Sequence, residues 1–234
     1  MNGPTKFTQT ELGLAVLVLV IISALLMACE PPYGRISKRG NITIGINNCR
    51  QIITALRLYS SDHDGNYPDH LLSDPKSSNE VFRVLFKKEV LDDEMIFGCP
   101  VSPFVPDGKI GSKPDFSRAV EAGENHWAMT VGLSDSAGGS IPFVYESPAV
   151  ATWSPKWNPD AKGKLVKGRA WSNGIIIGMN DSSVAVRPLA EKQGTAVPLK
   201  EIADGKNLFT QNDDPADPNT WKILDVETVA KAGP

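Results

Sequence analysis

Residues 10–28 read TELGLAVLVLVIISALLMA, and this stretch decides the architecture of the chain. From Leu12 to Ala28 the only polar side chain is that of Ser23. A helix rises about 1.5 Å per residue, so this run is roughly 25 Å long, at the short end of what crosses a bilayer core. The run therefore predicts a transmembrane helix or the apolar region of a cleaved signal sequence.

The charges beside the apolar run bear on its orientation. Arg35, Lys38 and Arg39 follow it, whereas Lys6 is the one basic residue before it. Because positive residues favour the cytoplasmic side of a membrane, this asymmetry taken alone places the following domain in the cytoplasm.

Two processing signals overlap at this end of the chain. Phe7-Thr8-Gln9-Thr10-Glu11 leads directly into the apolar run. Glu11 is either a favourable acid in the first helical turn or a charge that needs a partner at the membrane. Leu26-Met27-Ala28-Cys29 resembles a lipoprotein box, which makes Cys29 a candidate for lipidation.

A second helix is expected between residues 41 and 63, after Pro31-Pro32 interrupts or kinks the first. Apolar residues recur there at helical spacing and predict one buried stripe. The stripe comprises Ile42, Ile46, Cys49, Ile53 and Leu56. Asp64-Gly65-Asn66 is expected to end this helix in a turn.

The remainder predicts a loop-rich α+β domain with a small antiparallel sheet. We expect a helix over 81–90, loops over 98–124, strands at 126–132, 142–146 and 165–170, and a short helix near 198–203. The clearest hairpin pairs 174–179 with 184–187 around the turn at 180–183.

No catalytic or cofactor motif stands out, so the sequence does not predict an enzyme, a cofactor or a metal site. His63, His70 and His126 are widely spaced, with no triad order. Four candidate oxygen ligands fail the EF-hand spacing and favour a polar turn after a helix. They are Asp62, Asp64, Asn66 and Asp69. A net charge of −3 argues against nucleic-acid binding.

Three tryptophans and three cysteines leave alternatives open. Trp153, Trp157 and Trp171 suit packing over a thin core, or else a sugar-stacking surface. Cys49 and Cys99 form a disulfide if the domain is exported, or else are two buried free thiols.

The N-terminal segment resembles that of type IV prepilins and type II secretion pseudopilins, in which Phe-Thr-x-x-Glu precedes an apolar run. The resemblance implies cleavage between Lys6 and Phe7 by a prepilin peptidase, methylation of the new amine, and Glu11 as the carboxylate that aligns subunits. Lys6 stands where the family has glycine, and Gln9 and Thr10 replace an apolar pair.

A second group of motifs resembles the pilin-like proteins of planctomycetes and verrucomicrobia. They are Asn47–Ile52, Ala55–Tyr59, Asp62–Asp69, Glu124–Ala128 and the late hairpin over 178–186. The resemblance implies a long N-terminal helix packed on a small antiparallel sheet. It also implies a single-pass inner-membrane protein whose C-terminal domain is periplasmic or extracellular.

Three segments follow from this interpretation. Residues 1–28 form the leader and transmembrane helix, 29–63 its kinked amphipathic continuation, and 64–234 the globular domain. The expected partners are the lipid bilayer, other pilin-like subunits with their assembly platform, and prepilin peptidase. The alternative is a periplasmic lipoprotein, lipidated at Cys29, with a ligand- or glycan-binding domain.

Overall fold

The computed structural model describes residues 38–100, 102–172, 174–211 and 221–229. These residues belong to one compact unit that begins at Lys38. The predicted transmembrane segment, and with it Lys6, Phe7, Glu11 and Cys29, lies outside the described residues. Among the described helices, none has the length and apolar character needed to cross a membrane.

The predicted amphipathic helix is α2, which spans Lys38–Ser61. Its stripe is completely buried at Cys49, Ile53 and Leu56, as is the neighbouring Ile52, whereas Ile42 and Ile46 are partly buried. The polar turn expected after it is confirmed, because Asp64 and Gly65 have φ angles of 54° and 79°, in the left-handed region.

A second helix, α3, spans Ser78–Lys87 and confirms the helix expected over 81–90, shifted by three residues. The Ser77 side chain accepts a hydrogen bond from the Glu80 amide and so caps the helix. Phe82, Leu85 and Phe86 lie on its buried face. Short 3-10 helices occur at Pro68–Leu71 (η1), Met95–Phe97 (η2) and Pro159–Ala161 (η3).

The sheet has five strands in the order β4-β3-β2-β1-β5, and every neighbouring pair is antiparallel. The strands are β1 (Trp127–Val131), β2 (Pro142–Glu146), β3 (Gly174–Met179), β4 (Val184–Pro188) and β5 (Lys222–Leu224). The fold is therefore the α+β class that the sequence predicted, with a small antiparallel sheet.

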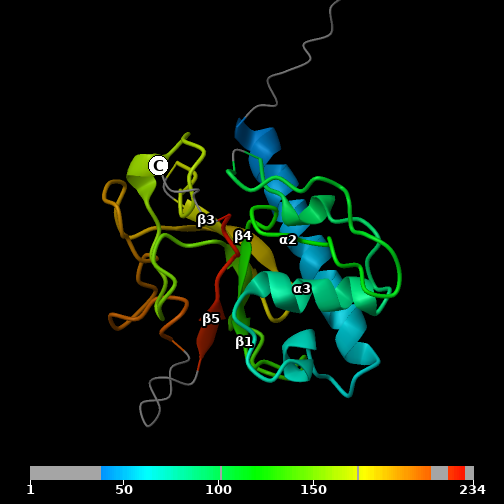
Figure 1. The fold of residues 1–234 in the computed structure, drawn as a ribbon. Coiled ribbons are helices and arrows are strands. Elements are labelled where there is room, and N and C mark those ends of the chain that lie inside the picture. Colours follow the sequence, from blue (N-terminus) through cyan, green and yellow to red (C-terminus); the bar gives the residue numbers. More distant parts are fainter. Residues whose placement is uncertain (1–37, 101, 173, 212–220, 230–234) are drawn as a thin grey trace, which may run out of the picture. The chain divides into compact units, whose positions relative to one another are not determined.

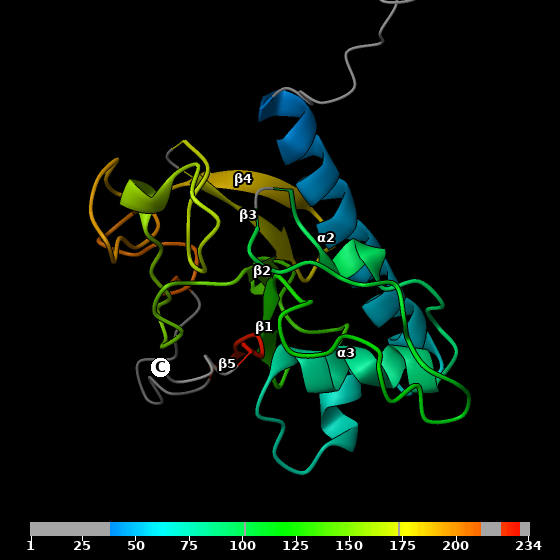
Figure 2. The same cartoon turned by 45° about the horizontal axis from the view of Figure 1, so that its top comes forward.

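The central strands are buried on both faces, and alternate residues enter two separate cores. In β3, Ile176 packs towards the helices, whereas Ile175 and Ile177 pack on the other side. Figures 1 and 2 show α2 and α3 on one side of the sheet and the loops between β2 and β5 on the other. The structure thus has three layers, of helices, sheet and loops.

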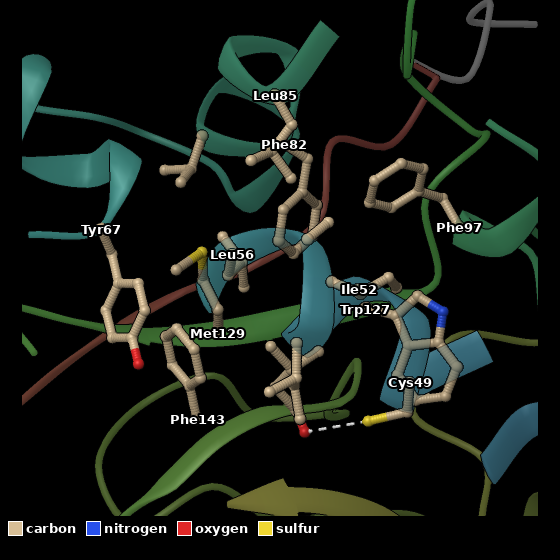
Figure 3. Packing of buried hydrophobic residues seen from close by; sticks show 14 of the residues in the cluster. Cys49, Ile52, Leu56, Tyr67, Phe82, Leu85, Phe97, Trp127, Met129 and Phe143 are labelled. Atoms are coloured by element: carbon tan, nitrogen blue, oxygen red, sulfur yellow. Dashed lines mark hydrogen bonds between the residues drawn. The ribbon is translucent and has the colours of Figure 1, made fainter. Parts of the chain in front are cut away.

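The larger core lies between the helices and the sheet (Figure 3). Tyr67 packs against Phe143, with 4.3 Å between ring centroids, and Phe82 against Phe97, with 4.9 Å. The smaller core centres on Trp157 and is covered by loops. α2 therefore belongs to the same compact unit as the sheet.

Three sequence-based expectations about elements need correction. Residues 165–170 form no strand, because Leu165 and Val166 are exposed and Gly168 has a φ of 76°. Residues 198–203 form no helix; Leu199 instead makes a β-bridge to Leu189. The strand β5 was not expected at all.

Candidate functional site

The most unusual feature of the described structure is a charged cluster in its interior. Glu146 ends β2 and is completely buried, and Arg169, in the loop before β3, is 1% exposed. Burying a charge costs several kcal/mol unless it is paired and hydrogen-bonded, so such groups require an explanation.

The Glu146 carboxylate is surrounded by donors. Its Oε1 accepts hydrogen bonds from Trp171 Nε1 at 2.9 Å and from His126 Nε2 at 3.1 Å. Its Oε2 accepts the backbone N–H of Ile176 in the neighbouring strand, at 2.8 Å. The carboxylate thereby connects the end of β2 to β3, to the start of β1 and to the loop before β3.

Arg169 supplies the compensating positive charge. Its Nη2 lies 3.7 Å from Glu146 Oε1 and donates to the Pro100 carbonyl at 2.9 Å. Its guanidinium also stacks on the Trp171 ring, 4.1 Å from the centroid. The charge pair and its hydrogen bonds therefore join Pro100 and its loop to the sheet.

His126 is neutral in this environment, because burial lowers its pKa below the ordinary value of 6.5. An ionised carboxylate can only accept a hydrogen bond, so the neutral ring carries its proton on Nε2, and this N–H donates to Glu146. Nδ1 then accepts from the Ser102 hydroxyl at 2.8 Å, and the Ser102 oxygen in turn accepts the Phe104 amide at 3.1 Å.

Ser102, His126 and Glu146 have the connectivity of a hydrolase triad, but their surroundings do not suit one. The Ser102 side chain is 5% exposed and its oxygen already serves the Phe104 amide. The nearby cavity of about 260 Å³ is lined by Arg169 and Trp171, and not by Ser102 or His126. Among the described residues, the Ser102 hydroxyl is thus not part of the wall of that cavity.

Cys99, His126 and Glu146 also offer three ligand atoms within 4.8 Å of one another, a donor set that zinc uses. Arg169 Nη2 lies 4.0 Å from Cys99 Sγ, so a positive charge already stands beside these atoms. Burial and the neighbouring Glu146 carboxylate raise the pKa of the Cys99 thiol. The cluster is satisfied by its own side chains.

A second group of acids is explained by loop hydrogen bonds. Glu94 is 1% exposed and accepts the backbone N–H groups of Gly108, Lys109 and Val120. These bonds fix the long 98–124 segment, which is a loop region as expected. Asp107 and Glu124 lie close to this carboxylate, but an acidic cluster with its donors in place needs no ion.

Cys49 and Cys99, for which the sequence left a disulfide or two free thiols open, are both free thiols, and both are buried. Cys49 lies on α2 and donates to the Val144 carbonyl at 3.5 Å, whereas Cys99 faces Glu146 at 3.8 Å. Burial raises the pKa of both thiols. Of the two alternatives left open by the sequence, the structure contains the free thiols.

The three histidines do not converge. His63 stacks on Tyr59 with ring centroids 3.8 Å apart, and His70 Nε2 is hydrogen-bonded to the Leu133 carbonyl. Of the three, only His126 belongs to the buried cluster, where it is 1% exposed.

The polar motif over 62–69 closes a turn and holds a loop. Asn66 makes a β-bridge to Ser134, and Asp69 Oδ2 accepts the Gly132 amide at 2.9 Å. Asp62 and Asp64 are not brought into a ligand group with Asp69, which agrees with a polar turn after a helix.

The tryptophans serve packing. Trp157 is completely buried and donates to the Glu146 carbonyl, and Trp171 is 7% exposed. Trp153 packs edge-on against Phe209, with centroids 5.2 Å apart. Packing over a thin core, the first of the two alternatives for these side chains, is what the structure contains.

Glu146 and Arg169 were missed by sequence reasoning. The available signal was a carboxylate directly after the apolar run Phe143-Val144-Tyr145, at the end of a predicted strand. Comparison of the chain with family models, with curated proteins and with solved structures finds no match.

Proposed function

We propose that this protein is a structural subunit of the pilin-like or pseudopilin-like kind. One N-terminal helix anchors it in the inner membrane, with the following domain periplasmic or extracellular. Through that helix it assembles with other subunits and an assembly platform in a type II secretion or type IV pilus-like system. It performs no catalysis and needs no cofactor.

The observation that supports this proposal is the order of elements at the start of the chain. An apolar run over residues 12–28 is followed, from Lys38, by an amphipathic helix whose buried face packs on β2, β3 and β4. The opposite face of α2 remains exposed at Ile44, Arg50 and Leu58. A helix held in this way offers a neighbouring subunit a continuous outer surface.

The buried cluster supports a structural role for the domain. Glu146 and Arg169 make their hydrogen bonds to the protein's own backbone and side chains. Active sites, in contrast, gather perturbed groups where a substrate can reach them.

Exchange of Glu11 for alanine tests the assembly role. In this proposal Glu11 pairs with the N-terminal amine of a neighbouring subunit, so Glu11→Ala should lower the yield of cross-linked multimers in native membranes roughly tenfold or more, as expected for a lost charged hydrogen bond. Glu30→Ala, just beyond the apolar run, is the matched control and should assemble normally. Wild-type assembly of Glu11→Ala would contradict the role.

The mass of the mature N-terminus separates this proposal from the lipoprotein alternative. A methylated Phe7 supports prepilin processing at the Lys6–Phe7 bond. An acylated Cys29 removes Glu11 from the mature chain and replaces the proposal with the lipoprotein. Mass spectrometry of protein extracted from host membranes gives this answer directly.

A further inference from the structure

A basic and apolar loop, residues 162–166 (Lys-Gly-Lys-Leu-Val), projects from the body of the protein. Leu165 is 64% exposed and Val166 is 41% exposed, and the side chains of Lys162 and Lys164 are exposed beside them. Two neighbouring apolar side chains left in water next to two ammonium groups suit a surface that is both anionic and apolar.

The fold holds this loop at both ends. Ala161, buried at the end of η3, accepts the backbone N–H of Lys164 at 2.9 Å. Gly168 packs so closely on Ala149 that a Cβ at this position would clash with it. The exposure of Leu165 is therefore imposed by a fixed loop.

The loop lies beside the start of α2. Asn41 and Ile42 of α2 share the walls of the 260 Å³ cavity with Lys162 and Gly163. Only residues 29–37 separate α2 from the apolar run, and an extended chain of that length spans at most roughly 30–35 Å. With the apolar run in a membrane, as proposed, this linker keeps the start of α2 within that distance of the membrane surface, and the loop lies beside the start of α2.

The charges near the loop favour an anionic partner. Lys167 is already paired with Asp225, whereas Lys162 and Lys164 have no ion-pair partner among the described residues. Asp160 is the exposed acid in the adjoining η3. Neither ammonium group is paired with a carboxylate of the described residues, so both can contact phosphate groups outside the protein.

We infer that loop 162–166 rests on the anionic phospholipid surface of the membrane that holds the N-terminal helix, an inference that depends on the proposed anchor. Lys162 and Lys164 contact lipid phosphates, and Leu165 and Val166 enter the headgroup region. Such a contact is weak by itself, but the tether makes it an intramolecular event and raises its effective concentration. The loop thereby fixes the orientation of the domain on the bilayer.

Lipid quenching of a fluorophore on the loop tests this inference. The full chain carrying Cys29→Ser is labelled with an NBD group at Leu165→Cys, or at Ile202→Cys as the control, since these sites are 64% and 62% exposed. Cys49 and Cys99 are buried, which confines labelling of the folded protein to the new thiol. Each protein is reconstituted in phosphatidylcholine vesicles, with or without an equal part of phosphatidylglycerol, that contain doxyl-labelled lipid.

In the anionic vesicles we expect the label at 165 to be quenched at least about twofold more than the label at 202. In neutral vesicles this difference between the two sites should be smaller. Each lysine at an anionic surface shifts such a contact about fivefold. Exchange of both Lys162 and Lys164 for glutamate should therefore abolish the difference between the two sites.

The outcomes separate this inference from the proposed function. Equal quenching at the two sites, in protein that stays in the vesicles through an alkaline carbonate wash, overturns the loop contact and leaves the anchor intact. Protection of the label at 165 by neighbouring subunits, with no lipid quenching, also overturns it in favour of a protein partner. Release of the chain by the wash overturns the anchor and the inference together.

Discussion

At the scale of single residues, the packing of the domain depends on buried charged and polar side chains. The Glu146 carboxylate has five polar neighbours, and all of its hydrogen bonds join segments that are distant in sequence. Buried ion pairs often contribute little net stability, but loss of one partner leaves the other unpaired at a high cost. Their value here is the specific positioning of Cys99, Pro100 and the start of β1.

His126 makes the stability of this cluster sensitive to acid. Because burial lowers its pKa in the folded state, the unfolded chain binds a proton more readily below about pH 6.5. The stabilisation that neutral His126 gives the folded state is therefore fully present above that pH, and it is lost as the pH falls towards the folded-state pKa. Between about pH 7.5 and 5.5 we expect a loss of about 1 kcal/mol in the free energy of unfolding.

Urea unfolding at the two pH values, followed by tryptophan fluorescence, measures this loss. His126→Gln retains an N–H donor for Glu146 but does not titrate, so its stability should depend less on pH than that of the wild type. An equal loss in both proteins would show that other groups are responsible.

At the scale of elements, the contact between α2 and the sheet depends on small residues. Gly178 in β3 faces the helix, and a Cβ there would lie 2.9 Å from Cys49 Sγ and clash with Ile53. Gly45 on α2 has the same role, because a Cβ there would clash with the Ile176 side chain and lie 3.2 Å from Cys99 Sγ. The helix therefore lies closer to the strand than a side chain at these positions would permit.

Exchange of Gly178 for alanine should destabilise the protein by about 1–3 kcal/mol through overpacking. Chemical unfolding of the full chain gives the value. Gly138→Ala is the matched control, because its new Cβ would have only ordinary contacts of 3.4 Å or more with Ile141. A Gly178→Ala variant as stable as this control would mean that α2 shifts away at little cost.

Local signals explain which elements the sequence predicted. Two apolar runs around Asn180–Ser183 define the β3–β4 hairpin by themselves, and the helical stripe of α2 needs no further information. The strand expected at 165–170 does not form, because Leu165 and Val166 are exposed and so do not mark the buried face of a strand. β5 has only three residues, and it is a strand because it pairs with β1, far away in sequence.

The candidate site was less predictable than the fold for the same reason. Glu146 meets His126 and Arg169 only after the sheet has formed, and no local pattern encodes such a meeting. The repeated apolar residues that identified β2 as a buried strand indicated nothing about the partners of the carboxylate at its end.

At the scale of the whole molecule, β5 and residues 225–227 join the sheet to the helical side of the domain. β5 covers the outer edge of β1, and the residues after it contact α3 and the 98–124 loops. Arg83 pairs with Glu227 at 2.7 Å, the Ser78 amide donates to the Asp225 carbonyl at 2.9 Å, and the Gly123 amide donates to the Glu227 carbonyl at 3.0 Å.

A chain that ends at residue 221 should therefore lose about 3–5 kcal/mol of stability, from several hydrogen bonds of about 1 kcal/mol each and a partly buried ion pair. It should also aggregate, since the edge of β1 would be open. A chain that ends at Val229 keeps every contact described above and should match the wild type in its unfolding midpoint. Equal midpoints for the two truncations would refute this role of the tail.

The burial of two reduced thiols has a practical consequence. A thiol reagent cannot reach Cys49 or Cys99 in the closed domain, and Cys49 lies beneath the contact between α2 and the sheet. Its rate of modification therefore reports how often the helix separates from the strands, without any introduced probe. A lower rate after assembly than before it would show that neighbouring subunits suppress the separation of α2 from the sheet.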